Sequence, residues 1–259
     1  MNFLHKILAT TLAVVITLSV VEATPTSVFW TNCTTDVVDT GKGHFMVDNY
    51  FTVFNRRGHG QIFAPDVGVT FGIFSWNDFK IEAGIDYLGG TDDPIFFNTK
   101  IGIAEDKLFC YAPSCSIGIF NMGTRYHGHN KTNQNIVDLV FGHTLPECIG
   151  GTFCVAGFAG NRCMGKNRQG FMVSYVRTFC PATDCDGTKY NKWAFEADYA
   201  SGKNTIGGGG FCIAHYFTPN VYLETGPVWF NTAKYGNGSW KWSMQVYIDF
   251  PAWKWCSNS

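Results

Sequence analysis

Hydrophobic and polar residues alternate along the last long segment of the chain, residues 240–250. One set of alternate positions is apolar: Trp240, Trp242, Met244, Val246, Ile248 and Phe250. The intervening set is mostly polar: Lys241, Ser243, Gln245, Tyr247 and Asp249. Because successive side chains of a strand point to opposite faces, this period of two predicts a β-strand with one apolar and one polar face. The same alternation recurs at residues 79–87 and 192–199.

The length of these segments favours a membrane barrel over a soluble β-sandwich. Strands of soluble proteins are about five or six residues long, whereas the clearest segments here reach about nine to eleven, enough for a tilted strand to cross a bilayer. Aromatic residues at the ends of the apolar faces agree with the girdles of such barrels. The chain contains twelve candidate strands, near residues 43–55, 66–75, 78–88, 94–104, 114–122, 133–145, 150–161, 168–179, 190–201, 206–218, 220–230 and 239–250. We therefore predict an all-β fold, a closed antiparallel transmembrane β-barrel over residues 43–250, because closure leaves no unpaired edge in hydrocarbon.

The lengths of the connections indicate which end of the barrel faces the cell. If the C-terminus is periplasmic, the short connections at 75–78, 145–150 and 218–220 all lie on the periplasmic side. The long polar stretches at 56–65 and 123–133 then lie outside, which matches the short inner turns and longer outer loops of bacterial barrels. Two inner connections, near 105–113 and 180–189, are longer than this pattern prefers.

The N-terminus has the form of a secretory signal peptide. Lys6 supplies a positive charge, residues 7–21 are apolar, and Val21-Glu22-Ala23 offers a small-residue cleavage point. We expect a signal peptide at 1–23, an N-terminal periplasmic segment at 24–42, the barrel at 43–250 and a C-terminal tail at 251–259. No later segment supplies the roughly 18 uninterrupted apolar residues of a membrane helix.

The overall composition agrees with export and gives no reason to expect nucleic-acid binding. Charged residues make up 15% of the chain, against about 25% in typical domains, and aromatic residues make up 16%. The mean hydropathy is only −0.02, so apolar residues are interleaved with polar ones rather than massed. The net charge is −1, without the overall excess of basic residues that is typical of nucleic-acid-binding domains.

Ten cysteines in an exported chain indicate an oxidising compartment and disulfide bonds. The predicted topology places eight of them at the periplasmic rim as disulfide candidates: Cys33, Cys110, Cys115, Cys148, Cys154, Cys180, Cys185 and Cys256. Cys163 and Cys212 are the exceptions. Their pairing does not follow from sequence, and two readings stay open: staples within the chain, or cross-links to neighbouring envelope proteins. The spacings match neither a zinc site nor a covalent haem site, and no cofactor is expected.

The polar faces of the predicted strands define an ionisable inner wall. The candidate pore-lining residues are Asp48, Glu82, Asp86, Lys100, Asp138, Glu196, Asp198, Glu224, Lys241 and Asp249. Carboxylates outnumber lysines in this set, and acidic rings favour cations, so we expect a mild cation preference. The alternative is that these charges pair across the lumen and close it, since a barrel of this size is narrow.

No residue set predicts catalysis, and we expect the protein not to be an enzyme. His127 and His129 supply only two metal ligands, which favours a solvated loop over a metal site. The run of glycines at 207–210 lacks the strand-then-helix context of a phosphate loop. It predicts a close backbone approach or a bend in the sheet.

Taken together, the signal peptide, the long amphipathic strands and the terminal strand ending on Phe250 resemble a porin-type outer-membrane protein of Gram-negative bacteria. This architectural resemblance covers the whole mature chain and implies a water-filled channel for small hydrophilic solutes or ions, embedded in outer-membrane lipid, with homo-oligomers as a known state of the family. In that family the final aromatic residue serves in assembly, which would here involve Phe250, Ile248 and Val246. This chain departs from the pattern by adding residues 251–259. The cysteine content more narrowly resembles the disulfide-linked envelope porins of chlamydiae and their environmental relatives.

Two other functions remain as alternatives. The first is a closed barrel that works as an adhesin or as a disulfide-linked structural protein of the envelope. The second is a secreted β-sandwich glycoprotein, for which Asn32, Asn130 and Asn237 begin acceptor tripeptides.

Overall fold

Twelve antiparallel strands form almost the whole structure, a computed structural model that describes residues 27–53, 64–89, 93–128, 131–236 and 239–253. The strands are β1 Lys42–Phe51, β2 Asp66–Trp76, β3 Phe79–Leu88, β4 Ile95–Ile103, β5 Ser114–Gly123, β6 Asn133–Thr144, β7 Thr152–Ala159, β8 Gln169–Thr183, β9 Lys189–Ala200, β10 Gly208–Thr218, β11 Val221–Phe230 and β12 Trp240–Pro251. Two short helices, η1 Arg162–Met164 and α2 Ala233–Gly236, lie in connections. No helix among the described residues is long and apolar enough to cross a membrane.

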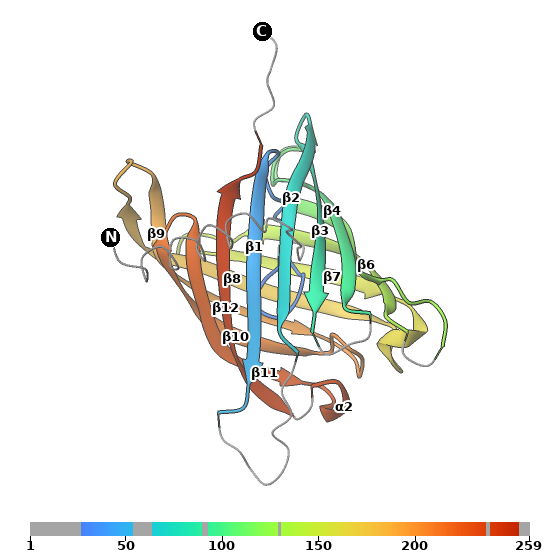
Figure 1. Ribbon diagram of the computed structural model, residues 1–259. Coiled ribbons are helices and arrows are strands. Elements are labelled where there is room, and N and C mark those ends of the chain that lie inside the picture. The colour runs from blue at the N-terminus through green and yellow to red at the C-terminus, as the bar shows by residue number, and fades with distance from the viewer. Residues whose placement is uncertain (1–26, 54–63, 90–92, 129–130, 237–238, 254–259) are drawn as a thin grey trace, which may run out of the picture.

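Each strand pairs with its neighbours in the chain, and β1 pairs with β12 to close the barrel (Figure 1). The closing pair is regular from Lys42 opposite Pro251 to Phe51 opposite Trp242. Every strand edge is therefore hydrogen-bonded, as a wall in hydrocarbon requires. The predicted fold class, a closed antiparallel barrel of twelve strands, is confirmed, and the β-sandwich alternative is wrong.

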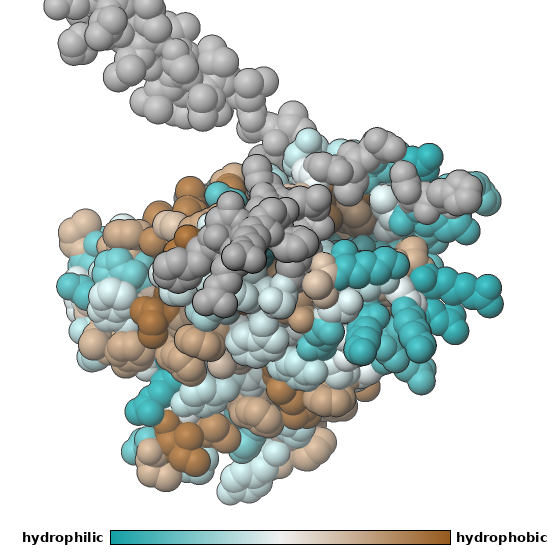
Figure 2. Space-filling model, turned by 90° about the horizontal axis from the view of Figure 1, so that it is seen from below, coloured by the Kyte–Doolittle hydropathy of each residue, from teal (hydrophilic) through white to brown (hydrophobic). Residues whose placement is uncertain are grey.

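The two alternating sets of side chains lie on opposite faces of the wall, the apolar set outside and the polar set inside. In β12, the side chains of Met244, Val246 and Ile248 are exposed on the outside. Lys241, Ser243, Gln245 and Tyr247, on the inner face, are buried. The outer wall carries exposed apolar residues from strand to strand: Phe97, Ile101, Ile117, Val137, Leu139, Phe141, Phe153, Val155, Phe171, Phe211 and Ile213. In Figure 2, a view from the end that carries α2, brown apolar residues are frequent on the left and teal hydrophilic residues gather on the right.

The two ends of the barrel differ in their connections. One end, here called the hairpin end, holds the connections that follow β2, β4, β6, β8 and β10, together with the start of β1 and the end of β12. Two of these connections are two-residue turns, 77–78 and 219–220, and Asn77 adopts a positive φ of 54°. The opposite end, here called the α2 end, holds η1 and α2.

The strand boundaries correct one sequence expectation. The connection expected at 180–189 is shorter, because β8 continues to Thr183 and β9 begins at Lys189. Cys180 therefore lies in a strand and not in a connection. Its positive φ of 62° marks an irregular position, and the register with β9 resumes at Pro181 opposite Asn191. The connection between β4 and β5 remains long.

The N-terminal residues 27–41, here called the inner segment, lie inside the barrel (Figure 1). We expected an N-terminal periplasmic segment at residues 24–42. The described part of that range before β1 lies within the barrel, because its backbone bonds to inward-facing side chains of β3, β4, β5, β8, β9 and β12.

Candidate functional site

Asp198 of β9 holds the inner segment near the α2 end. One carboxylate oxygen, Oδ2, accepts hydrogen bonds from the backbone N–H groups of Trp30 at 2.8 Å and Thr31 at 2.6 Å. The indole N–H of Trp30 also donates to the carbonyl oxygen of Ile206, at 2.9 Å. Residues 27–39 belong to no strand, and inward side chains of the wall supply partners for backbone groups that water would otherwise provide.

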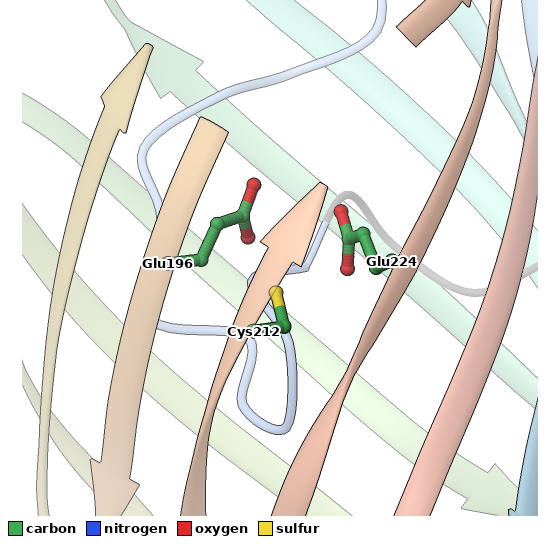
Figure 3. A group of neighbouring side chains, drawn as sticks. All are labelled: Glu196, Cys212 and Glu224. Carbon is green, nitrogen blue, oxygen red and sulfur yellow. The ribbon is translucent and has the colours of Figure 1, made fainter. Parts of the chain in front are cut away.

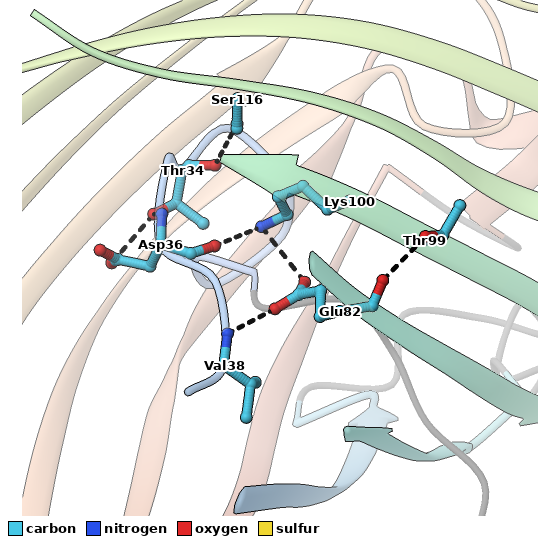
Figure 4. A network of polar contacts seen from close by, with 7 residues as sticks. All are labelled: Thr34, Asp36, Val38, Glu82, Thr99, Lys100 and Ser116. Atoms are coloured by element: carbon cyan, nitrogen blue, oxygen red, sulfur yellow. Dashed lines mark hydrogen bonds and ion pairs between the residues drawn. The ribbon is translucent and has the colours of Figure 1, made fainter. Parts of the chain in front are cut away.

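A second group of wall residues binds the middle of the inner segment (Figure 4). Lys100 Nζ donates to the carbonyl oxygen of Asp36 at 2.8 Å and lies 3.6 Å from Glu82 Oε1. The other oxygen of Glu82 accepts the N–H of Val38 at 2.7 Å. The two charges face each other on adjacent strands, since Glu82 pairs with Lys100 in the register of β3 and β4. Both side chains are buried, and each compensates the other while bonding the segment.

Hydroxyl and amide side chains of the wall complete this backbone recognition. Ser174 donates to the carbonyl oxygen of Cys33 at 2.5 Å, and Ser116 donates to that of Thr34 at 3.2 Å. The Gln245 amide donates to the carbonyl oxygen of Phe29 at 2.9 Å. Side chains of several strands thus form hydrogen bonds with the backbone of the inner segment. These bonds fix the path of the segment through the lumen.

Two apolar anchors also hold the inner segment. Phe29 is 1% exposed and packs in a buried cluster with Tyr50, Cys212, Val228 and Phe230. The second anchor is Cys33, which is fully buried in a cluster that includes residues of β6, β7 and β8. Full burial of an aromatic side chain such as Phe29 contributes roughly 2–3 kcal/mol.

Glycines of the inner wall leave room for the inner segment. A Cβ added at Gly72 would lie 2.1 Å from the carbonyl oxygen of Asp39, and one at Gly210 would lie 2.7 Å from Phe29 Cδ1. Neither contact is compatible with a larger residue unless the segment moves. Gly210 belongs to the glycine run that predicts a close approach, and the close partner is Phe29.

The inner segment ends at the hairpin end on a pair of lysines. Asp39 accepts hydrogen bonds from Lys42 at 2.8 Å and from Lys80 at 2.6 Å. These two bonds, that of Lys42 first, lower the pKa of the Asp39 carboxyl group below its ordinary value. The inner segment therefore runs along the lumen from the α2 end to the hairpin end.

All ten residues predicted from the polar faces lie on the inner wall. Nine of them are buried, with relative exposures from 0% to 7%: Asp48, Glu82, Asp86, Lys100, Asp138, Glu196, Asp198, Glu224 and Lys241. Asp249 is half-buried and its Oδ1 lies 2.7 Å from His44 Nδ1. An open, water-filled lumen would leave such residues exposed. Here the inner segment and neighbouring side chains cover them, and their role as pore lining belongs to the proposal below.

A cavity of about 550 Å³ separates residues 27–32 from the wall near the α2 end. Three carboxylates of adjacent strands line it: Asp48 of β1, Asp66 of β2 and Asp86 of β3. Asp48 pairs with Asp66 in the strand register, and Tyr50 and Trp30 add aromatic surface. This part of the lumen is therefore acidic.

A row of aromatic residues follows the inner wall toward the hairpin end. The rings of Tyr216 and Tyr222 stack with centroids 4.5 Å apart, and those of Tyr222 and Tyr247 with centroids 4.7 Å apart. His44 stacks on Tyr247 at 5.3 Å and reaches Asp249. Stacked phenols fill this side of the lumen without adding charge.

Most of the described cysteines lie at the hairpin end or in the interior. Cys110, Cys148, Cys180 and Cys185 are exposed at the hairpin end, and Cys115 is half-buried. Cys33 lies in the lumen and not at the rim, Cys154 is buried on the inner face of β7, and Cys163 lies in η1 at the α2 end. None of the nine described cysteines is in a disulfide. Cys256 lies outside the described residues, as does His129.

Sequence reasoning missed the residues that bind the inner segment through neutral groups. The wall residues concerned are Gly72, Ser114, Ser116, Ser174 and Gln245. Each occupies the polar phase of its strand, so the alternation places it on the inside. No local signal connects it to residues 27–41, which are 31 to 218 positions away in the sequence.

Comparison with known proteins gives similarities of architecture at low identity. No protein-family model and no curated protein matches the sequence. Among solved structures, the KdgM porin is 10% identical with a TM-score of 0.46, covering 81% of this chain and 99% of its own. An outer membrane channel from Pseudomonas putida F1 is 10% identical with a TM-score of 0.42, covering 83% of this chain and 98% of its own. A mutant of the Rh. blastica porin is also 10% identical, with a TM-score of 0.39 over 73% of this chain and 56% of its own. At these values we rest no argument on the likenesses, and the fold is taken from the structure itself.

Proposed function

We propose that the protein is an outer-membrane channel of porin type whose inner segment restricts the passage of small hydrophilic solutes or ions. The observation that carries this proposal is the division of the wall, with exposed apolar side chains outside and ionisable side chains inside. Apolar side chains exposed around a closed barrel favour lipid as the surrounding medium. A barrel that served only as an anchor would not need ten ionisable residues on its inner wall.

The inner wall and the cavity favour cations. Eight of the ten ionisable residues named above are carboxylates and two are lysines, and the cavity adds the carboxylate of Asp66. Fixed negative charge in a narrow passage attracts cations and repels anions. Small cations are therefore the solutes that we expect to pass most readily once the inner segment leaves room for them.

The burial of the inner wall supports a second candidate function, a closed barrel that acts as an adhesin or structural envelope protein. Contacts with β3, β4, β5, β8, β9 and β12 hold the inner segment. Exposed cysteines at the hairpin end, Cys110, Cys148 and Cys185 among them, are suitably placed for cross-links to other envelope proteins. The narrower likeness to the cysteine-rich porins of chlamydiae stays a prediction.

The two functions are separated by conductance in planar bilayers. The chain from Thr24 onward, refolded in detergent, is compared with a variant that lacks residues 27–39. A point variant, Gly210→Leu, directs a side chain into the position of Phe29. Gly157→Leu is the matched control, because a Cβ at Gly157 meets no atom within 4 Å and this position of β7 is exposed.

A restricted channel gives rare, small conductance steps in the parent chain and large ohmic steps in the deletion variant. Gly210→Leu then shifts the channel toward the open state, and Gly157→Leu does not. A reversal potential under a salt gradient should indicate a preference for cations. Silence of the deletion variant, when it is folded and inserted, would contradict the channel and support the closed barrel.

A further inference from the structure

Three buried side chains of adjacent strands converge on the inner wall (Figure 3). Glu196 of β9, Cys212 of β10 and Glu224 of β11 each direct a potential ligand atom inward, and these atoms all lie within 4.8 Å of one another. Figure 3 shows the two carboxylates on either side of the Cys212 sulfur. The three residues are between 1% and 6% exposed.

The strand register fixes this arrangement. Cys212 pairs with Glu196 across β10 and β9, and Glu224 pairs with Ala214, two residues further along β10. Residues two apart on a strand share a face, so both glutamates lie beside Cys212 on the inner wall. The side chains do not depend on a connection for their position, because all three are on paired strands of the closed sheet.

The cluster is short of positive charge. Glu224 Oε2 is buried and has no hydrogen-bond partner among the residues that the structure describes. Within the described part of the chain, neither Glu196 nor Glu224 forms an ion pair with a lysine, arginine or histidine. Asp198 stands two positions from Glu196 and adds a further carboxylate, whose Oδ1 also lacks a hydrogen-bond partner in the described ranges. Burying unpaired carboxylate groups is unfavourable unless a cation or a proton compensates them.

We propose that Glu196, Cys212 and Glu224 form a binding site for a divalent metal ion, and that Zn²⁺ is the ion that fits the donor set best. Zinc accepts thiolate sulfur and carboxylate oxygen together, whereas Ca²⁺ and Mg²⁺ require oxygen ligands. Tetrahedral zinc with bonds of about 2.0–2.3 Å separates its ligand atoms by roughly 3.3–3.8 Å. The present ligand atoms, all within 4.8 Å of one another, would approach that range by side-chain rotation on binding, with water in the fourth position.

The site adjoins the anchor of the inner segment. Cys212 belongs to the same buried cluster as Phe29, and Asp198, on the same face of β9 as Glu196, accepts the N–H groups of Trp30 and Thr31. A metal ion bound here would join β9, β10 and β11 at the surface on which the segment rests. The inference concerns binding to the wall and does not require that the lumen conducts.

Metal binding is tested on the refolded chain from Thr24 onward, after accessible thiols have been alkylated and excess reagent removed. Co²⁺ is the probe, because its bond to a thiolate gives a charge-transfer absorption band that carboxylates alone do not produce. Zn²⁺ affinity is measured by displacement of Co²⁺. The variants are Cys212→Ser, Glu196→Gln and Glu224→Gln, and the matched control is Cys154→Ser, which removes another buried thiol of the inner wall.

We expect one Co²⁺ per folded chain, a thiolate band, and displacement by Zn²⁺. Cys212→Ser should abolish the band, each glutamine variant should weaken binding at least about tenfold, and Cys154→Ser should retain both. Absence of metal uptake by the folded parent chain would overturn the proposal in favour of a proton shared by the two carboxylates. A band that persists in Cys212→Ser would also overturn it. If Cys212→Ser does not fold, unchanged affinity in Glu224→Gln has the same consequence.

Discussion

Replacing Asp198 by Asn should weaken the attachment of the inner segment to the wall without creating a cavity at position 198. Asp198 Oδ2 accepts the N–H groups of Trp30 and Thr31, at 2.8 and 2.6 Å. Asparagine has nearly the same shape and retains one acceptor oxygen, but it carries no charge. The substitution therefore weakens both hydrogen bonds and leaves the surrounding packing in place.

The magnitude follows from the difference between charged and neutral acceptors. A hydrogen bond to a charged group contributes about 1.5–3 kcal/mol and a neutral one about 0.5–1.5 kcal/mol, so two weakened bonds correspond to a loss of about 2–3 kcal/mol. Part of this loss is offset, because Asp198 Oδ1 is buried with no hydrogen-bond partner in the described part of the chain and the neutral side chain is easier to desolvate. A net effect of about 2 kcal/mol lowers the ratio of seated to released segment roughly 30-fold.

Open probability in planar bilayers measures this ratio, since the proposed function identifies the released state with the conducting one. Asp198→Asn should raise the ratio of open to closed time by about one to two orders of magnitude and leave the conductance of each step nearly unchanged. Asp186→Asn serves as the control, because Asp186 lies in the exposed connection between β8 and β9. An unchanged open probability in correctly folded Asp198→Asn would refute the claim that these two hydrogen bonds keep the inner segment in the lumen.

Three further predictions concern the wall, the thiols and the hairpin end. Val246→Arg places a charge on the outer face of β12 and should lower the free energy of unfolding in lipid vesicles by about 2–4 kcal/mol, whereas equal stability would place that face outside the lipid. A maleimide should label the exposed Cys110, Cys148 and Cys185 in the reduced, folded protein much faster than the buried Cys33, Cys154 and Cys212, and equal rates would contradict the described burial. Glu105 accepts hydrogen bonds from Thr144, which with the neighbouring His143 lower its pKa. A lowered pKa contributes stability above the ordinary carboxyl value that is lost as the pH falls through the lowered one, so melting temperatures of the parent and Glu105→Gln should differ at neutral pH and converge below about pH 4; a constant difference would contradict the linkage.

The alternation of side chains made the barrel predictable. Lys241, Gln245 and Tyr247 occupy one phase of β12 and Met244, Val246 and Ile248 the other, and a strand in a closed wall can satisfy both only by placing them on opposite sides. The twelve candidate strands correspond to the twelve observed ones. Among the differences, β1 ends at Phe51 and not near residue 55, and β8 continues past Cys180 to Thr183. A local irregularity such as that of Cys180 leaves no mark in a period-two pattern.

Residues 27–41 could not be placed from the sequence. The segment has no hydrophobic period, and its position results from partners such as Glu82, Asp198 and Gln245. These residues line the same lumen only once β1 has paired with β12 and closed the barrel. The converging set of Glu196, Cys212 and Glu224 has the same origin, because its spacings of 16 and 12 residues match no local metal motif.

The inward and outward residues and the number of strands in the wall can be read from the chain, because they depend on the period of side chains along each strand. What occupies the lumen, and which inward residues meet, become visible only in the folded barrel. Those properties depend on closure of the sheet, which brings the N-terminal residues into contact with strands as distant as β12.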